Sequence, residues 1–284
     1  MSIEHISDTA RWVALYRAME SERPDAHFRD PFARVLAGAK GEDILEAIPK
    51  ARTMGWPMVV RTVLFDELLR ERIAQGADTV VNLAAGLDAR PWRMDLPQSL
   101  RWVDVDLEGI LRHKTEAMAH HPPRCGYRAV HADLTDADTR SRVLAEAVDG
   151  ARHAVVLTEG LLVYLTREQV AALAGDLAAQ PAYRWWITDL GSPLLERFMV
   201  RAWGDAVSRG NAPFRFFPPE GTDFFRPLGW AEAEFRSTGD EARRLHRTMR
   251  GAWLWGFMSL LMPAKRRREM RRMSGTVLLK RADD

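Results

Sequence analysis

Four small or acidic residues follow apolar runs of this sequence, at the points where strands would end. They are Gly86, Asp106, Asp133 and Glu159. In an open α/β sheet, such positions line the crevice that binds ligands. Glycine lets the backbone approach a ligand closely, and the Asp106 carboxylate is placed to accept hydrogen bonds from both hydroxyls of a ribose. Asp133 is placed to reach an adenine amino group. The pattern predicts a site for a cofactor that carries a nucleoside.

The turn around Gly86 argues against a cofactor that carries a pyrophosphate. A dinucleotide site wants Gly-x-Gly-x-x-Gly at the start of a helix, where free amides hold the phosphates. Residues 84–89 read Ala-Ala-Gly-Leu-Asp-Ala, so two of those glycines are missing, and Asp88 would repel a phosphate. NAD and FAD are therefore disfavoured. S-adenosylmethionine fits better, because it has a ribose, an adenine and two cationic groups that tolerate carboxylates. We expect Asp88 to cap the following helix, and Arg90 to pair locally with a carboxylate.

Strands and helices alternate through the middle of the chain. Apolar runs predict strands at 79–84, 101–106, 127–131, 153–157 and 183–188, with helices at 108–120, 137–149 and 167–179. This alternation predicts an α/β fold with a parallel sheet built from right-handed crossovers. Residues 1–75 have apolar residues at helical spacing, and we expect them to form an N-terminal helical extension or cap.

The rhythm breaks after Gly191. Residues 193–229 are rich in proline and phenylalanine, which predicts an irregular or helical insertion, interpreted as a lid. Their phenylalanines at 214, 216 and 217, and Trp230, are expected in the core rather than in an aromatic substrate pocket. A strand at 231–237, a helix at 239–250 and a strand at 276–280 would complete a mostly parallel seven-stranded sheet. Residues 76–284 would then form the cofactor-binding domain.

Composition and charge narrow the class of protein. The chain has 284 residues, 41 Lys and Arg against 39 Asp and Glu, and a formal net charge of +2. Phosphate binding favours a basic face, so no nucleic-acid partner is predicted. The single cysteine, Cys125, excludes an intramolecular disulfide and a Cys-based zinc site. The histidines have no metal-ligand spacing, and no metal is predicted.

No apolar stretch reaches the ~20 residues of a membrane span. The nearest candidate, 252–262, stops at Pro263 and predicts a buried helix. The N-terminus has no basic region followed by an apolar run, as a signal peptide would. We expect a soluble, cytoplasmic protein with no membrane partner. The basic run 265–272 is expected to be a solvated helix face rather than a contact for an acidic partner or an anionic substrate carrier.

The segment Val81 to Arg90, Val-Asn-Leu-Ala-Ala-Gly-Leu-Asp-Ala-Arg, resembles the first motif of the leucine carboxyl methyltransferase family. That family includes bacterial O-methyltransferases associated with polyketide biosynthesis. Similar segments occur in family order over about residues 7–190: Asp8-Thr9-Ala10 through Arg17-Ala18 to Asp30-Pro31-Phe32, Arg61-Thr62 with Asp66, Val105-Asp106-Leu107 with Lys114, Asp133-Leu134, and Glu159 to Leu165. The resemblance implies a class I, Rossmann-like methyltransferase fold with helices on both faces of the sheet, and S-adenosylmethionine as cofactor.

The resemblance also implies which residues bind that cofactor. The implied set is Arg17, Arg61, Ala85, Gly86, Asp106, Leu107, Asp133, Leu134, Glu159 and Gly160. Arg61, with Arg17 nearby, would pair with the carboxylate of the methionine part, and Glu159 would hold its ammonium. Asp106 would hold the ribose, and Asp133-Leu134 the adenine. Family members often have glycine at the position of Ala84, and the added methyl group would tighten this turn.

The predicted activity is an S-adenosylmethionine-dependent O-methyltransferase with a small-molecule acceptor. A phenol, with a pKa near ~10, would benefit from a general base, and no residue declares itself as one. A carboxylate or an acidic hydroxyl is therefore the favoured acceptor group. Tyr164 is a candidate catalytic residue that positions the substrate, although its ring could instead pack under the cofactor. The alternatives are a silent cofactor- or partner-binding module, a nucleotide-dependent oxidoreductase, and a carboxyl methyltransferase acting on a protein C-terminus. The oligomeric state is not predicted.

Overall fold

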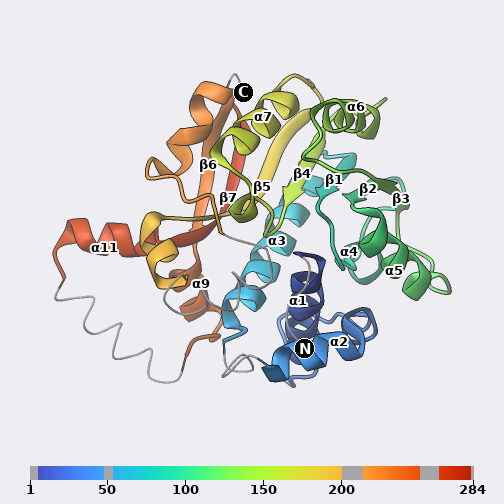
Figure 1. Cartoon of the computed structure of the whole chain (residues 1–284), viewed down its shortest axis with the longest axis horizontal. Coiled ribbons are helices and arrows are strands. Elements are labelled where there is room, and N and C mark those ends of the chain that lie inside the picture. The colour runs from blue at the N-terminus through green and yellow to red at the C-terminus, as the bar shows by residue number, and fades with distance from the viewer. Residues whose placement is uncertain (1–5, 48–53, 200–213, 250–261, 283–284) are drawn as a thin grey trace.

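The computed structural model describes residues 6–47, 54–199, 214–249 and 262–282, and a seven-stranded sheet runs through its centre (Figure 1). The strand order is β3-β2-β1-β4-β5-β7-β6. The strands are β1 Thr79–Leu83, β2 Arg101–Asp106, β3 Gly126–His131, β4 Ala154–Thr158, β5 Tyr183–Gly191, β6 Trp230–Ser237 and β7 Ser274–Arg281. The first five are parallel, and β7 runs antiparallel to β5 and β6. The predicted mostly parallel sheet is confirmed.

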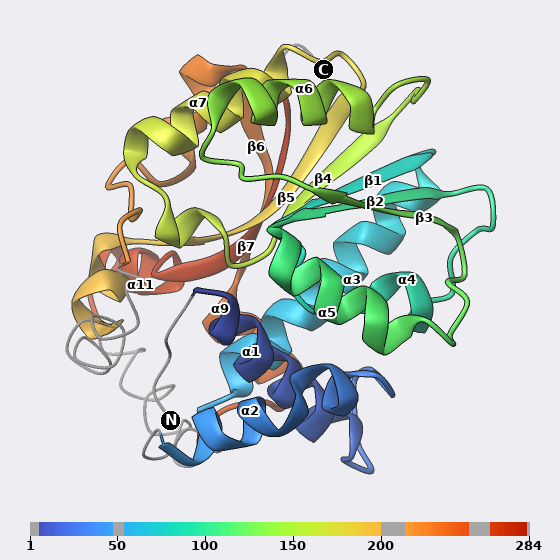
Figure 2. The ribbon, with the colours of Figure 1, turned by 45° about the vertical axis from the view of Figure 1, so that its right-hand side comes forward.

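Helices cover both faces of this sheet. They are α1 Ile6–Ser21, α2 Ala33–Ala47, α3 Trp56–Ala74, α4 Arg90–Arg93, α5 Glu108–Met118, α6 Ala137–Ala147, α7 Arg167–Ala178, α9 Thr238–Arg244 and α11 Ala264–Arg271. Figure 2 shows α6 and α7 on one face and α3, α4 and α5 on the other, with α1 and α2 beyond α3. Two short 3-10 helices, η2 Leu162–Tyr164 and η3 Gly221–Leu228, follow β4 and precede β6.

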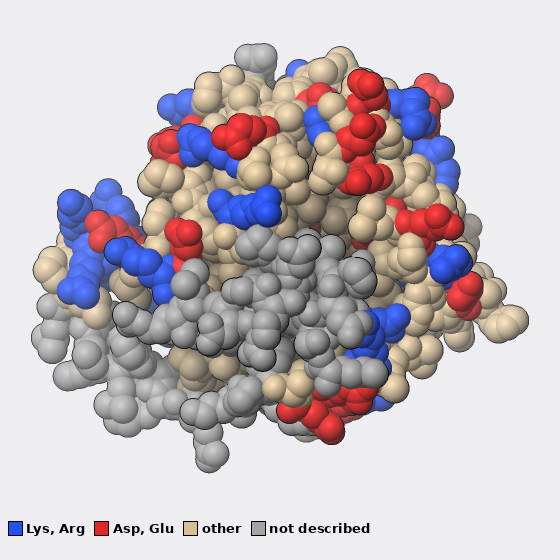
Figure 3. Space-filling view, viewed as in Figure 1, with Lys and Arg blue, Asp and Glu red and all other residues tan. Residues whose placement is uncertain are grey.

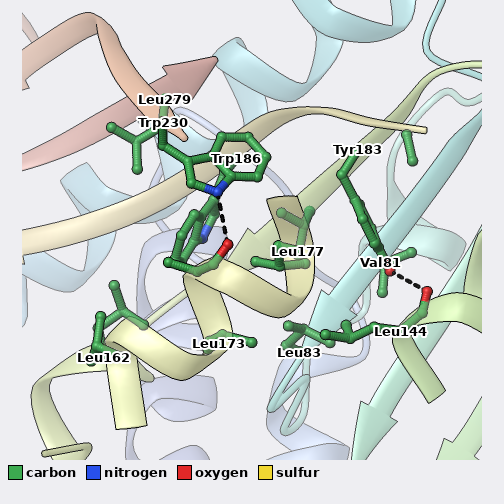
Figure 4. Close-up of a cluster of buried hydrophobic side chains, with 14 of the residues drawn as sticks. Val81, Leu83, Leu144, Leu162, Leu173, Leu177, Tyr183, Trp186, Trp230 and Leu279 are labelled. Carbon is green, nitrogen blue, oxygen red and sulfur yellow. Dashed lines mark hydrogen bonds between the residues drawn. The ribbon is translucent and has the colours of Figure 1, made fainter. Parts of the chain in front are cut away.

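The central strands are buried on both sides, as expected when helices cover both faces of a parallel sheet. Alternate residues of β1 show this: Val81 packs with α6 and α7, whereas Val80 packs with α3. Aliphatic and aromatic residues together fill the α6–α7 side (Figure 4), where the Tyr183 hydroxyl donates to the Leu144 carbonyl at 2.9 Å. Phe216, Phe217 and Trp230 are buried, as predicted.

Two element boundaries differ from the predicted ones. β5 continues to Gly191, three residues beyond the predicted end, because Asp189 to Gly191 pair with the start of β7. The helix predicted at 239–250 ends at Arg244, shortly before His246, whose φ of 50° lies in the left-handed region. A residue in that conformation cannot continue a right-handed helix.

The predicted lid is described only in part. Residues 193–199 are helical, and η3 lies within its second half. Residues 200–213, and nearly all of the predicted buried helix at 252–262, lie outside the described residues. The division at residue 75 stays a prediction. No helix of the described part is long and apolar enough to cross a membrane.

Candidate functional site

One large cavity follows the carboxyl ends of the parallel strands and continues past the end of β6 and the start of β7. Its volume is about 1440 Å3. Every site residue predicted from the sequence lines it: Arg17, Arg61, Ala85, Gly86, Asp106, Leu107, Asp133, Leu134, Glu159, Gly160 and Tyr164. The fold thus brings the whole predicted set to one place, while the role of each residue toward a ligand stays a prediction.

The turn after β1 is tied to the end of β2 by a carboxylate. Asp106 accepts the Gly86 N–H through Oδ2 at 2.6 Å and the Leu107 N–H through Oδ1 at 2.7 Å. An ionised carboxylate offers about four lone-pair positions, so both oxygens can still accept hydrogen bonds from a ligand. Burial raises the pKa of Asp106. Gly86 has a φ of +51°, and a Cβ there would lie 3.2 Å from the Ala10 Cβ, so α1 packs directly on the turn.

Arg61 of α3 lies between two carboxylates at the ends of β4 and β5. Its Nε lies 3.1 Å from Glu159 Oε1, and its Nη1 lies 3.4 Å from Asp189 Oδ2. Asp189 Oδ1 also accepts the Gly160 N–H at 2.6 Å. Burial alone would raise the pKa of Glu159, but the positive charges of Arg90 and Arg61 lower it below its usual range. Glu159 is therefore held as an anion at the cavity wall.

Asp189 was missed in the sequence. The predicted strand stopped at Thr188, so the next residue was not recognised as a strand-end acid. The argument that selected Asp106 and Glu159 would have selected Asp189 as well, because it follows an apolar run and is the next acidic residue. In the structure, Asp189 belongs to β5 and pairs with Thr276 of β7.

A buried charge network supports Glu159 from behind. Arg90 lies 2.7 Å from Asp66, 2.6 Å from Asp88 and 2.8 Å from Glu159 Oε2. The local carboxylate pairing predicted for Arg90 is confirmed. The prediction that Asp88 caps the following helix is wrong by one residue, because Ala89 is the N-cap of α4; Asp88, the residue before it, accepts the Arg90 N–H at 2.9 Å. Burial would raise the pKa of Asp88, but Arg90 and the neighbouring cations hold it well below its usual range.

Arg17 reaches the same turn from α1. It donates to the Leu87 carbonyl at 2.6 Å and pairs with Asp30 at 3.1 Å, both in buried surroundings. These contacts join the N-terminal helices to the turn after β1. The predicted contact of Arg17 with a cofactor carboxylate is additional to them and stays a prediction.

The cavity residues that follow β2 and β3 are partly exposed to solvent. Asp133 is exposed, and its Oδ1 accepts the N–H and the hydroxyl of Thr135 at 2.9 and 2.7 Å. Leu107 is 42% exposed although it lines the cavity. Leu134 is partly buried and packs against the core. An apolar and a carboxylate side chain at this place suit a flat base with an amino group.

Tyr164 lies on η2 and lines the cavity. Its ring centroid is 5.8 Å from that of Phe214. Burial raises the pKa of the Tyr164 hydroxyl, so this phenol stays protonated at neutral pH. It can donate a hydrogen bond to an oxygen in the cavity and is poorly suited to remove a proton.

Many of the side chains that line the cavity are apolar. They include Leu195, Phe198, Met199, Phe214, Phe217, Met262, Met270 and Met273. Phe214 is only partly buried and lines the cavity, so the expectation that it belongs to the core holds less well for it than for Phe216 and Phe217. Within the described residues, no group of three His, Cys, Asp or Glu side chains could hold a metal ion.

Known proteins similar to this chain are methyltransferases. A protein of Streptomyces avermitilis named as an S-adenosyl-L-methionine-dependent methyltransferase is 33% identical over 232 residues, covering 78% of this chain and 80% of that protein. One of Streptomyces coelicolor with the same description is 35% identical over 236 residues, with coverage of 78% and 80%.

Solved structures share the fold. A DUF574 family protein from Streptomyces avermitilis matches with a TM-score of 0.60 at 13% identity, over 96% of this chain and 97% of that one. A structure from Thermobifida fusca, described as a methyltransferase, matches with a TM-score of 0.56 at 15% identity, over 99% and 96%. The sheet order and these matches identify the class I, Rossmann-like methyltransferase fold. Residues 10–178 match the family model described as leucine carboxyl methyltransferase. The chain therefore belongs to the leucine carboxyl methyltransferase family of S-adenosylmethionine-dependent methyltransferases.

Proposed function

We propose that this enzyme methylates a carboxylate or an acidic hydroxyl of a small molecule, including acids of polyketide origin. The observation that carries the proposal is that one cavity is lined both by the strand-end carboxylates and by many apolar side chains. Sites for a drug-sized ligand usually measure ~300–1,000 Å3, and this cavity measures about 1440 Å3. It therefore has room for a cofactor and an acceptor side by side.

The donor set at the strand ends fits S-adenosylmethionine. Five carboxylates and two arginines line this section: Asp88, Asp106, Asp133, Glu159 and Asp189, with Arg17 and Arg61. The excess of negative charge suits a ligand with an ammonium and a sulfonium group and opposes a pyrophosphate. The oxidoreductase alternative is disfavoured for this reason. When bound, S-adenosylmethionine supplies a methyl group that the positive sulfur has already activated.

We assign the cofactor contacts as the family resemblance implies. Asp106 would accept the ribose hydroxyls, because its oxygens are already oriented by two backbone amides. Arg61 would pair with the carboxylate of the methionine part, helped by Arg17, while Glu159 would hold the ammonium beside Gly160. Asp133, Leu107 and Leu134 would hold the adenine. Ala85 and Gly86 would contact the methionine part through their backbone.

The protein itself has to position the acceptor oxygen and exclude water. Holding two reactants in line is a large part of catalysis in such reactions. Residues of the helical segment 193–199 and of η2 line the cavity. Tyr164 would donate a hydrogen bond to the acceptor. Among the described cavity residues the one histidine, His246, lies after α9 at the other end. An acceptor that arrives ionised needs no base, which favours a carboxylate or an acidic hydroxyl.

The proposal is tested first by cofactor binding and then by turnover. S-adenosylhomocysteine at 100 times its dissociation constant should stabilise the protein by about 2.7 kcal/mol, a rise of several degrees in the thermal midpoint. NAD should produce no rise. Transfer of labelled methyl to a panel of aromatic and aliphatic carboxylic acids, and to a peptide with a free C-terminus, then separates the acceptor classes. Binding of S-adenosylhomocysteine without any methyl transfer would favour a catalytically silent binding module. Methyl transfer to the peptide alone would favour a protein C-terminus as the acceptor in place of a small molecule.

The remaining predictions concern the protein's location and its partners. A cytoplasmic location, a small-molecule acceptor and the lack of nucleic-acid and membrane partners follow from composition and stay proposals. The basic helix α11, which covers most of the run 265–272, has no buried residue, as a solvated helix face requires.

A further inference from the structure

The ends of β4 and β5 are held side by side by their register. Thr158 pairs with Thr188 in the parallel ladder, and the Thr158 hydroxyl donates to the Thr188 hydroxyl at 2.8 Å. The residue that follows each threonine is an acid, Glu159 after β4 and Asp189 within β5, and both line the cavity. Asp189 also pairs with Thr276 of β7, which fixes its backbone from the other side. The sheet therefore holds two carboxylates at neighbouring positions of the cavity wall.

The Arg61 guanidinium lies across both of these carboxylates. Its Nε is 3.1 Å from Glu159 and its Nη1 is 3.4 Å from Asp189. The three side chains are mostly buried, with exposed fractions of 14% for Arg61, 13% for Glu159 and 26% for Asp189. On the face of the molecule in Figure 3, by contrast, Lys and Arg lie interspersed with Asp and Glu at the surface, where an ion pair contributes little. Charges shielded from water interact more strongly, so the position of the guanidinium depends on both partners.

The two carboxylates differ in what else they bind. Glu159 is shared between two arginines, because its other oxygen lies 2.8 Å from Arg90. The other oxygen of Asp189 instead accepts the Gly160 N–H at 2.6 Å. Burial alone would lower the pKa of Arg61, but the negative charge of Asp189, followed by that of Glu159, raises it. Asp189 is therefore the stronger electrostatic partner of Arg61.

Gly160 leaves room for this guanidinium. Its φ is +71°, and a Cβ at this residue would lie 3.0 Å from Arg61 Nη1. Nη1 is the nitrogen that contacts Asp189. Asp189 thus holds both the Gly160 backbone and the guanidinium that packs against it, at one point of the cavity wall.

We propose that Asp189 is a positioning residue for the amino-acid end of the cofactor, and that it acts through Arg61. This inference rests on the proposed function, in which Arg61 binds the carboxylate of the methionine part and Glu159 its ammonium. Asp189 holds Nη1 on the β5 side, so the guanidinium does not turn fully onto Glu159. One cation and one anion then remain available to a ligand group that carries both charges.

The test compares two ligands by calorimetry. S-adenosylhomocysteine has the amino-acid end, whereas 5′-methylthioadenosine has the same nucleoside and thioether without it. Asp189→Asn should raise the dissociation constant of S-adenosylhomocysteine about tenfold and change that of 5′-methylthioadenosine less than about twofold. The control Asp223→Asn, at an exposed position of η3, should change neither. An unchanged affinity for S-adenosylhomocysteine would overturn the proposal, and so would an equal loss for both ligands, which indicates a general disturbance of the strand ends.

A second comparison tests whether Asp189 acts through Arg61. Substitutions of residues in contact have non-additive effects. In an Arg61→Gln background, Asp189→Asn should therefore raise the dissociation constant of S-adenosylhomocysteine by less than about twofold. A further tenfold rise would show that Asp189 acts independently of Arg61, and would overturn the proposal. If Asp189→Asn does not fold, Gly160→Ala, whose methyl group would displace Nη1, is measured on the same two ligands and should show the same selectivity.

Failure of the proposed function is distinguishable from failure of this inference alone. If neither ligand binds the wild-type protein, the proposed function is contradicted, and this inference with it. If both ligands bind and Asp189→Asn weakens them equally, the cofactor assignment stands and only the role of Asp189 is refuted.

Discussion

The Asp106 carboxylate accepts the Gly86 N–H at 2.6 Å and thereby fixes the turn after β1 to the end of the neighbouring strand. The same carboxylate accepts the Leu107 N–H at 2.7 Å. Its oxygens are therefore oriented before any ligand arrives, which removes part of the ordering cost of binding. Whatever binds at this edge meets a carboxylate in one defined position.

Replacing this carboxylate should remove cofactor binding. A hydrogen bond to a charged group contributes ~1.5–3 kcal/mol, so losing two ribose contacts in Asp106→Ala should weaken S-adenosylhomocysteine at least about a hundredfold. Asp106→Asn should be nearly as weak, since an amide has one acceptor oxygen for two backbone amides. Calorimetry with Asp138→Ala, an exposed residue of α6, provides the control. Affinity within about threefold of wild type in Asp106→Ala would refute the ribose contact.

Asp189 should matter for the same ligand, although it has no assigned contact to it. Its two oxygens hold the Gly160 N–H and Arg61, and Asp189→Asn weakens both interactions. We expect the dissociation constant of S-adenosylhomocysteine to rise about tenfold. The exposed Asp223 of η3 gives the control variant Asp223→Asn. An unchanged dissociation constant would show that Arg61 is positioned without Asp189.

Arg90 should be a principal determinant of stability. Removing one partner from a buried ion pair costs ~3–5 kcal/mol, and Arg90→Met leaves Asp66, Asp88 and Glu159 without their shared cation. Arg70 provides a matched control, because it also contacts Asp66, at 4.0 Å, but its side chain is 55% exposed. Arg70→Met should change the free energy of unfolding by less than about 1 kcal/mol. Urea unfolding measures both, and equal losses would contradict the argument.

Ala84 is the one non-glycine residue at the binding turn with a left-handed conformation, with a φ of 52°. Such a conformation costs roughly 1–2 kcal/mol for alanine, while glycine adds ~0.5–1 kcal/mol of chain entropy to the unfolded state. Ala84→Gly should therefore stabilise the protein by about 0.5–1 kcal/mol. Ala85→Gly, next to it at a buried position without positive φ, should destabilise it. Thermal unfolding in which both variants change stability in the same direction would rule out backbone strain at Ala84.

Stability should fall at acidic pH because of the network around Arg90. Burial would raise the pKa values of Asp66, Asp88 and Glu159, but arginine charges lower all three. These carboxylates contribute fully to the free energy of unfolding at pH values above their ordinary pKa of ~4. That contribution is lost as the pH falls through the lower pKa values of the folded state. The difference in unfolding free energy between wild type and Arg90→Met should narrow from pH 7 toward pH 3. A constant difference would show that these carboxylates do not titrate with unfolding. Asp106 acts in the opposite direction, since burial raises its pKa.

The sequence by itself determined the order of strands and helices and the acidic edge of the site. Apolar runs bounded by polar residues are local patterns, and the carboxyl ends of parallel strands meet at one edge. Gly86, Asp106, Asp133 and Glu159 could therefore be placed together without a structure. The extra length of β5 was not predictable from its own residues, because Asp189 to Gly191 are strand residues only through their pairing with β7.

Only the tertiary structure decided which charged side chains meet. Arg61 lies between Glu159 and Asp189, 98 and 128 residues further along the chain, and Arg90 reaches back to Asp66. Arg267 and Arg271 of α11 line the same cavity as Arg243 of α9 for the same reason. Which charged groups pair depends on the distances between them in the folded protein. Those distances are set by the assembly of the sheet and cannot be inferred from local sequence patterns.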